Sequence, residues 1–310
     1  MKKRSRRQFN TLIAGSGLTS FFNLSNKSSA NNLKNKIIKR IIPSTNELIP
    51  IIGLGTSSSF KPSTLNKNIL KNRKNVVEAL LKGGGKLIDT APSYGKSEKI
   101  IGQILKSSGI EDDFFIATKV RSNDYNKGIQ EMKNSFIDLS QNTIDLIQVH
   151  NLVDTKNKLA VCREWRDEKK YRYIGVTHWL PKIQNNLISV MNSEKVDFVQ
   201  FQYNIENREA EDRILPEAKD RGISTIINVP FGRGRLFDIT KYTPLPQWAK
   251  EFCSSWAQFY LKYIISNEAV TCVIPATSKV ENMKDNLKGG EGRLPSKKER
   301  LRMIRFLEEI

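Results

Sequence analysis

The sequence predicts a single (β/α)8 barrel, and three observations lead to this fold class. From residue 48 onward, eight short apolar segments alternate with segments of helical periodicity. The apolar segments are almost continuously hydrophobic, which is typical of parallel strands covered by helices on the outside. Residues 48–310 also match the length of about 250 residues that such a barrel needs. A doubly wound open sheet is disfavoured because no GxGxxG motif follows the first strand.

The strands are expected where short apolar runs end at a glycine or at a polar side chain. Two clear examples are 114–120, which reads FFIATKV, and 144–151, which reads IDLIQVHN. In chain order the expected strands are 48–56, 86–91, 114–120, 144–151, 171–179, 197–204, 224–232 and 270–278.

The helices are expected where apolar residues recur at spacings of three and four. The segment 96–109 illustrates the pattern, with apolar residues at 100, 101, 104 and 105 and a glycine at its end. In chain order the expected helices are 75–84, 96–109, 127–140, 158–170, 182–194, 213–222, 255–267 and a last one that begins at 280.

Residues 1–30 are predicted to be a signal peptide of the twin-arginine type. Residues 5–9 read SRRQF, a soft apolar stretch follows at 11–24, and small residues at 28–30 offer a cleavage site. The alternative is a disordered basic arm. We expect the twin-arginine export machinery to carry the folded protein to the bacterial periplasm. A basic lead-in at 31–47 would then precede the barrel domain at 48–310.

The formal net charge of +19 raises the question of nucleic-acid binding. Ten of the nineteen excess charges fall within residues 1–40, and no known DNA- or RNA-binding motif is present, so we expect no nucleic-acid partner. No run of about 18 apolar residues is present, so we expect no membrane span in the mature protein. Three cysteines without CxxC spacing and only two histidines predict neither a disulfide framework nor a metal site.

Polar residues stand at the carboxyl end of every expected strand, where the active sites of such barrels lie. The residues at these ends are Thr56, Asp89 (with Tyr94 five positions later), Lys119, His150, Asn151, Thr177, His178, Gln200, Gln202, Asn204, Asn228, Thr277 and Ser278.

Four of these side chains form a chemically consistent set. An ammonium group such as Lys119 lowers the pKa of a neighbouring phenol such as Tyr94. The carboxylate of Asp89 would keep the lysine charged, and a neutral His150 could hydrogen-bond to a substrate oxygen. Such a set can protonate an oxygen on which negative charge develops, as in the reduction of a carbonyl group.

The chain resembles the aldo/keto reductase superfamily over about residues 48–287. The matching motifs occur in the family's order, and LIDTAPSYG at 87–95 is the most specific. The others are GLGT at 53–56, ATK at 117–119, DLIQVHN at 145–151, IGVTHW at 174–179, VQFQYN at 199–204, PFGRG at 230–234 and VIPATS at 273–278.

This resemblance implies a catalytic role for each of the four residues. Tyr94 would donate a proton to the carbonyl oxygen, Lys119 would tune the tyrosine and Asp89 would pair with the lysine. His150 would orient the carbonyl group. A reduced nicotinamide would transfer hydride directly to a small carbonyl substrate, without a metal.

The resemblance also implies a nucleotide site, for which NADP(H) is favoured and NAD(H) remains possible. Three departures from the family bear on it. His178 replaces an asparagine that binds the carboxamide, Asn228 replaces the ring that stacks on the nicotinamide, and Ala276 and Asn282 replace the basic residues that hold the 2′-phosphate. Lys279 and Lys284 lie close enough in sequence to substitute for them. The cofactor-binding residues implied are Thr56, Thr177, His178, Gln200, Asn228, Phe231, Gly232, Ala276, Thr277, Asn282 and Asn286.

Two other functions remain open from the residues alone. Lys119 at a strand end could form a Schiff base, as in a barrel aldolase. The departures at Asn228, Ala276 and Asn282 would also suit a non-catalytic barrel that binds nucleotide as a redox sensor. The glycines and arginines of 232–235 could cradle a phosphate or form a flexible loop. We expect the protein to be a monomer that acts on a small carbonyl or alcohol substrate.

Overall fold

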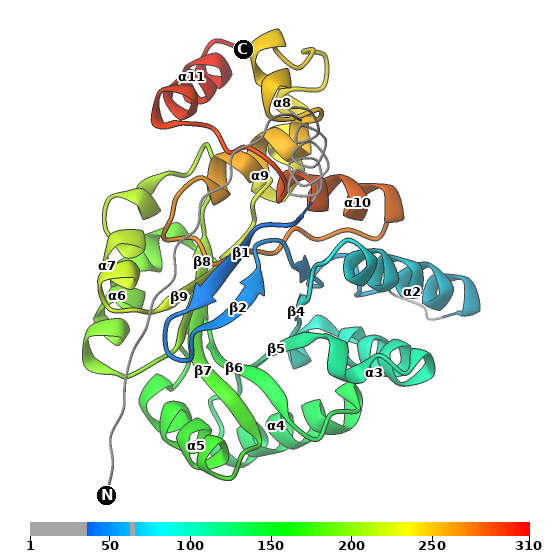
Figure 1. Ribbon diagram of the computed structural model, residues 1–310. Coiled ribbons are helices and arrows are strands. Elements are labelled where there is room, and N and C mark those ends of the chain that lie inside the picture. The colour runs from blue at the N-terminus through cyan, green and yellow to red at the C-terminus, as the bar shows by residue number, and fades with distance from the viewer. Residues whose placement is uncertain (1–35, 63–65) are drawn as a thin grey trace, which may run out of the picture.

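The computed structural model describes residues 36–62 and 66–310, and they form an eight-stranded parallel barrel (Figure 1). The predicted signal peptide and the first residues of the lead-in lie outside the described residues. Neighbouring strands pair in chain order, and the parallel bridges Ile52–Val273 and Gly55–Ala276 join the first strand to the last. The strands are β3 (Leu54–Gly55), β4 (Leu87–Asp89), β5 (Phe115–Val120), β6 (Ile144–His150), β7 (Tyr171–His178), β8 (Phe198–Gln202), β9 (Ser224–Asn228) and β10 (Cys272–Val273).

Helices surround the strands, as Figure 1 shows. Several begin at a side-chain cap: Asn66 accepts a hydrogen bond from Ile69 N, and Asp124 accepts one from Lys127 N. One helix follows each barrel strand, and two further helices, α8 and α11, lie after β9 and at the carboxyl end. The helices are α2 (Lys67–Lys82), α3 (Ser97–Ser108), α4 (Tyr125–Leu139), α5 (Thr155–Asp167), α6 (Gln184–Ser193), α7 (Ile214–Asp220), α8 (Arg235–Ile239), α9 (Trp256–Ile265), α10 (Val280–Gly289) and α11 (Lys297–Glu308).

The predicted fold class is confirmed, but the first expected strand is wrong in its extent. The segment 48–56 divides into β2 (Glu47–Pro50) and the barrel strand β3. Strand β2 pairs antiparallel with β1 (Lys39–Ile42), so the expected lead-in contributes half of a hairpin. The reason is visible in the alternation of burial, since Ile42 and Ile49 are buried whereas Ile41 and Leu48 are exposed.

The hairpin β1–β2 covers the amino-terminal end of the barrel. Ile42 and Ile49 belong to the same buried cluster as Leu87 and Phe115, the first residues of β4 and β5. The turn of the hairpin is attached to β7, because the Tyr173 hydroxyl lies 2.7 Å from both Thr45 Oγ1 and Glu47 Oε2. Apolar packing therefore fills this end, and the polar strand ends lie at the opposite one.

None of the helices in the described part of the chain is long and apolar enough to cross a membrane. The last strand, β10, contains only two residues, although the sequence analysis expected a strand over 270–278. The basic segment near the carboxyl end forms α11, which starts with a capping box between Ser296 and Glu299. Its Met303 is fully buried, so only part of this helix faces solvent.

Candidate active site

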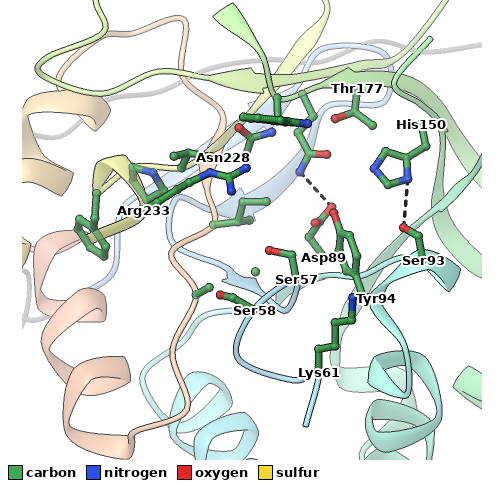
Figure 2. Close-up of a pocket in the computed structure, with 18 of the residues that line it drawn as sticks. Ser57, Ser58, Lys61, Asp89, Ser93, Tyr94, His150, Thr177, Asn228 and Arg233 are labelled. Carbon is green, nitrogen blue, oxygen red and sulfur yellow. Dashed lines mark hydrogen bonds between the residues drawn. The ribbon is translucent and has the colours of Figure 1, made fainter. Parts of the chain in front are cut away.

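A cavity of about 780 Å³ opens at the carboxyl ends of the strands. Its wall combines the ends of β4 and β6 to β9 with the loops after β3, β5, β9 and β10 (Figure 2). Eight of the residues to which the resemblance gave a catalytic or cofactor-binding role line this cavity, and so does the strand-end residue Asn151. The eight are Asp89, Tyr94, His150, Thr177, Gln200, Asn228, Phe231 and Ala276.

Asp89 and Lys119 form a buried ion pair just below the cavity. The register of β4 and β5 places Asp89 opposite Ala117, two residues before Lys119 on the same strand face. Lys119 Nζ lies 2.7 Å from Asp89 Oδ1 and donates a second hydrogen bond to Thr90 O at 2.8 Å. Burial lowers the pKa of Lys119, but the Asp89 carboxylate and the Tyr94 oxygen raise it, and in sum it lies above its ordinary value. The lysine is therefore charged at neutral pH.

Tyr94 stands on a single 3-10 turn, Pro92–Tyr94, directly after β4. Lys119 Nζ lies 5.2 Å from the centre of its ring. Burial raises the pKa of the Tyr94 hydroxyl and outweighs the opposite effect of Lys119, so the pKa lies above its ordinary value. The expectation that Lys119 lowers this pKa is correct for the effect of Lys119 itself, but the net shift of the Tyr94 pKa has the opposite sign. Tyr94 is consequently a neutral phenol with a proton to donate.

His150, at the end of β6, faces Tyr94 across the cavity. The two rings meet edge to face with their centres 6.0 Å apart, and His150 Nδ1 lies 3.5 Å from Ser93 Oγ. Burial, followed by the charges of Lys119 and Arg121, lowers the pKa of His150 to about 3. The expectation of a neutral imidazole is therefore confirmed.

The opposite wall offers amide and hydroxyl groups that suit a nicotinamide carboxamide. Gln200 Oε1 and Asn228 Oδ1 are buried and have no hydrogen-bond partner among the described residues. Thr177, on the neighbouring strand β7, lines the cavity beside them. A carboxamide needs both acceptors and donors, and these side chains supply them, so the residues fit the group.

His178 does not line the cavity, contrary to the role that the resemblance implies. Strand alternation turns it away from the face that carries Thr177. Its Nδ1 accepts a hydrogen bond from Leu180 N at 3.1 Å. In this structure the imidazole therefore stabilises the turn after β7.

Several other residues expected at the nucleotide lie outside the cavity. Thr56 is buried and donates to the backbone oxygen of Asp89 at 2.8 Å. Thr277 Oγ1 accepts from Lys279 N at 3.0 Å, so it supports the start of α10. Asn282 is exposed on α10, whereas Asn286 is buried on the same helix. Gly232 does not line the cavity, although its neighbour Phe231 does.

Three basic residues line the cavity: Lys61, Arg121 and Arg233. The sequence analysis gave Lys61 and Arg121 no role, whereas Arg233 belongs to the segment 232–235, for which it left phosphate binding open. Each follows a strand end within a few positions, and this is the signal that could have identified them. The guanidinium of Arg233 lies over the Trp179 ring, 4.3 Å from its centre. By contrast, Arg235 forms an ion pair with Glu206. The two arginines of 232–235 thus have different roles.

Among residues 36–62 and 66–310, no group of three or more His, Cys, Asp or Glu side chains is placed to hold a metal ion.

A sequence model of the aldo/keto reductase family matches residues 51–301. The chain belongs to the aldo/keto reductase family. It is thus an oxidoreductase of the aldo/keto reductase type, as its motifs indicate.

Two relatives illustrate the similarity of this aldo/keto reductase to known sequences. It is 34% identical over 175 residues to the aldo-keto reductase YhdN of Bacillus subtilis, and this match spans about half of either chain, 52%. It is 26% identical over 245 residues to an aldo-keto reductase of Mycolicibacterium paratuberculosis, covering 77% of this chain and 79% of the relative.

Solved structures of aldo/keto reductases share the same fold. An enzyme of Klebsiella pneumoniae in complex with NADPH superposes with a TM-score of 0.74 at 20% identity, over 87% of this chain and 96% of the other. The enzyme MGS-M4, from a Medee basin deep-sea metagenome library, superposes with a TM-score of 0.66 at 26% identity, over 84% and 92% of the two chains.

Proposed function

We propose that the protein reduces an aldehyde or ketone to an alcohol with a reduced nicotinamide nucleotide. The observation that carries this proposal is the geometry at the cavity: the rings of Tyr94 and His150 meet with their centres 6.0 Å apart, and Lys119 Nζ, paired with Asp89, lies 5.2 Å from the centre of the Tyr94 ring. When bound, the nucleotide supplies hydride from its nicotinamide ring. The protein supplies the proton, the orientation of the carbonyl group and the electrostatic environment.

Each residue has a defined part in this reaction. His150 donates a hydrogen bond to the carbonyl oxygen and so fixes the direction of the carbonyl group. Tyr94 gives its proton to that oxygen as negative charge develops there. Lys119 stabilises the phenolate that Tyr94 leaves behind, and Asp89 keeps Lys119 charged and in place. Thr177, together with the carboxamides opposite, would hold the nicotinamide amide.

NADP(H) is the cofactor we propose. Support comes from the usual cofactor preference of the family and from two exposed cations, Lys279 just before α10 and Lys284 on it. Ala276 and Asn282 carry no positive charge that could form an ion pair with a phosphate, so these lysines would have to provide it. Fluorescence titration of the purified protein with NADPH and with NADH tests the choice. A lower dissociation constant for NADH would reverse it.

Turnover of a panel of aldehydes and ketones with both nucleotides tests the reaction itself. We expect the reduced nucleotide, followed by the absorbance of its nicotinamide ring, to be consumed in the same amount as the alcohol is formed. A protein that binds neither nucleotide would contradict the proposal. The aldolase alternative needs a neutral amine, which the Asp89–Lys119 ion pair disfavours. Borohydride trapping in the presence of an aldehyde checks that point.

We also propose that residues 1–30 direct export through the twin-arginine pathway to the periplasm. Support comes from the sequence SRRQF at 5–9 and from the small residues at 28–30. Because reduced nicotinamide is a cytoplasmic compound, the folded protein would carry its nucleotide with it. Mass spectrometry of the protein from its host would detect both cleavage and the nucleotide. Replacing Arg6 and Arg7 with lysine should retain the protein in the cytoplasm.

We propose a monomeric protein. Large apolar side chains are exposed on several elements, for example Ile137 on α4 and Leu301 on α11, and Ile41 and Leu48 form one exposed cross-strand pair on the hairpin β1–β2. Light scattering after size-exclusion chromatography measures the mass directly. A mass twice that of one chain at micromolar concentration would contradict this proposal.

A further inference from the structure

We propose that the carbonyl substrate carries a negatively charged group, a carboxylate or a phosphate, which Arg121 and Lys61 bind. This inference rests on the proposed reductase function and names its substrate class. The cavity has one acidic residue in its wall among the described residues, Asp89, and Lys119 neutralises it. The cavity therefore has a surplus of positive charge beside the reacting groups.

The three cations of the cavity wall have no acidic partner. Lys61, Arg121 and Arg233 form no ion pair with any residue in the described ranges. The sequence of 1–35 and 63–65 contains no Asp or Glu that could supply one. Unpaired cations that line a cavity are available for an anionic ligand.

The arrangement of the strands separates these cations into two groups. The acid–base residues lie near the carboxyl ends of β4, β5 and β6, with Tyr94 just after β4, whereas the amide-binding residues lie on β7, β8 and β9. Strands β5 and β9 are four positions apart in the ring of eight, so the loops that carry Arg121 and Arg233 lie on opposite sides of the mouth. Figure 2 likewise shows His150 and Ser93 on one side and Asn228 and Arg233 on the other.

Arg121 belongs to the side on which the reaction takes place. Val120 pairs with Val149 in the register of β5 and β6. The next residues along the chain from these two are Arg121 and His150, so Arg121 and His150 are neighbours. The charge of Arg121 also contributes to the lowered pKa of His150, which agrees with their proximity. An anionic substrate group at Arg121 would therefore lie close to a carbonyl oxygen held by His150.

The loop that carries Arg121 is fixed by backbone contacts. Glu131 Oε2 accepts hydrogen bonds from Arg121 N at 2.8 Å and from Ser122 N at 2.9 Å. The carboxylate thus binds the main chain, and Glu131 takes part in none of the ion pairs among the described residues. A planar guanidinium in a fixed loop suits two-point recognition of a carboxylate or phosphate.

Lys61 approaches Tyr94 from the loop after β3. Its stem packs against Gly95, where the Cβ of any larger residue would lie 3.2 Å from Lys61 Cγ and 3.6 Å from Lys61 Cε. Gly95 has φ of +65°, so both its conformation and the adjacent lysine disfavour a larger residue. Figure 2 shows the Lys61 side chain extending toward Tyr94. The lysine therefore supplies a second positive charge at the same end of the cavity.

The nucleotide phosphates provide the competing explanation for these charges. With the nicotinamide amide at Thr177, Gln200 and Asn228, Arg233 is the cation on the nucleotide side. Arg121 stands across the ring from it and remains for the substrate. The buried Asn151 Oδ1, which also lacks a partner among the described residues, offers a hydrogen-bond acceptor on the substrate side.

The test compares substrates that differ in charge but hardly in shape. We expect the native protein to show a higher kcat/KM for 3- or 4-carboxybenzaldehyde than for neutral 4-carbamoylbenzaldehyde, by about 10- to 100-fold. Arg121→Gln should remove most of this preference while kcat/KM for the neutral aldehyde stays within about threefold. Lys61→Gln should give a smaller loss, and added salt should weaken the preference in the native protein.

Lys127→Gln is the matched control, because Lys127 is an exposed cation on α4 that does not line the cavity. It should leave the preference unchanged. Arg121→Lys, which keeps the charge, should restore part of it, and circular dichroism and the melting temperature verify that each variant is folded. Equal kcat/KM values for charged and neutral aldehydes in the native protein would overturn the inference and leave the reductase function intact.

A binding experiment separates failure of the inference from failure of the proposed function. Calorimetry with NADP⁺ present compares 4-(hydroxymethyl)benzoate with 4-(hydroxymethyl)benzamide, the alcohols that correspond to the para-substituted aldehydes. Tighter binding of the benzoate, lost in Arg121→Gln, would support the anion site even if no aldehyde were reduced. Failure to reduce any carbonyl would count against the proposed function alone. Equal binding of both alcohols would overturn the anion site.

Discussion

Gln200 Nε2 donates a hydrogen bond to Asp89 Oδ1 over 3.0 Å, although the two residues are 111 positions apart in the sequence. The same carboxylate oxygen accepts from Lys119 at 2.7 Å and from Gln148 Nε2 at 3.3 Å. The Gln200 amide nitrogen therefore binds the Asp89–Lys119 ion pair, whereas its oxygen, which has no partner among the described residues, is available to the nicotinamide carboxamide. This contact joins the two halves of the site into one hydrogen-bonded unit.

We expect Gln200→Ala to weaken nucleotide binding by about tenfold, because a buried acceptor for the carboxamide is lost. Gln148→Ala is the matched control, since it removes a donor to the same Asp89 oxygen from a residue that does not line the cavity. Fluorescence titration with NADPH should show the effect only in Gln200→Ala. Equal losses in both variants would mean that Gln200 acts only through Asp89.

Tyr94→Phe should lower kcat for carbonyl reduction by about 10²- to 10⁴-fold, because the proton donor is removed. The ring and its contact with His150 remain, so the melting temperature should change little. Nucleotide affinity should also be retained, since Tyr94 is not part of the amide-binding group. Single-turnover kinetics provide the rate of the chemical step. A variant with undiminished turnover would remove Tyr94 from the mechanism.

Glu98 should make stability depend on pH. It is 4% exposed on the first turn of α3, accepts a hydrogen bond from Thr118 Oγ1 at 2.5 Å, and burial raises its pKa to about 7 from 4.5. The folded protein therefore binds a proton between pH 4.5 and 7 that the unfolded chain does not, and this stabilisation is lost as the pH rises through that window. We therefore compare the free energy of unfolding of Glu98→Gln with that of the native protein. From low to neutral pH, this difference should shift in favour of the variant by up to about 3 kcal/mol.

His150 produces the opposite slope. Its pKa falls from 6.5 to about 3 in the folded protein, so the unfolded chain binds the extra proton and stability declines as the pH falls from 6.5. Urea unfolding of the native protein, Glu98→Gln and His150→Gln at about pH 4 and about pH 8 separates the two contributions. An identical pH dependence in the native protein and Glu98→Gln would show that Glu98 ionises normally.

The two arginines of 232–235 allow a controlled test of phosphate binding. Arg233 lines the cavity above Trp179, whereas Arg235 pairs with Glu206. Arg233→Gln should raise the dissociation constant for NADPH by about tenfold, since a charge-assisted contact is lost, and Arg235→Gln should raise it far less. Isothermal titration at two salt concentrations provides the comparison. A larger effect of Arg235→Gln would assign the phosphates to the other arginine.

The eight-fold alternation of strands and helices and the four catalytic candidates could be predicted from the sequence. The alternation follows from apolar runs, and Asp89, Lys119 and His150 follow from the polar residues near the strand ends. Tyr94 and the four catalytic roles follow from the motifs that resemble the family. The net pKa of Tyr94 could not be predicted, because it depends on how deeply the fold buries the hydroxyl. The sequence shows only that Lys119 and Asp89 are nearby.

Loop residues and strand faces account for the other differences. In the sequence, Arg121 and Lys61 cannot be told apart from the many other lysines and arginines. Only the path of the loops in the folded protein brings them to the cavity. His178 sits next to Thr177 in sequence, yet the two-residue period of a strand sends their side chains to opposite faces. The hairpin could not be predicted because the apolar run at 48–56 reads as one strand, while its division depends on a partner earlier in the chain.

The hairpin β1–β2 also determines how far the amino terminus can be shortened. Ile42 and the turn at Thr45 seal the end of the barrel opposite the cavity. A chain that started at residue 48 would leave Leu87 and Phe115 open to water and would tend to aggregate. A shortened chain that keeps this end of the barrel sealed would therefore have to begin upstream of Lys39.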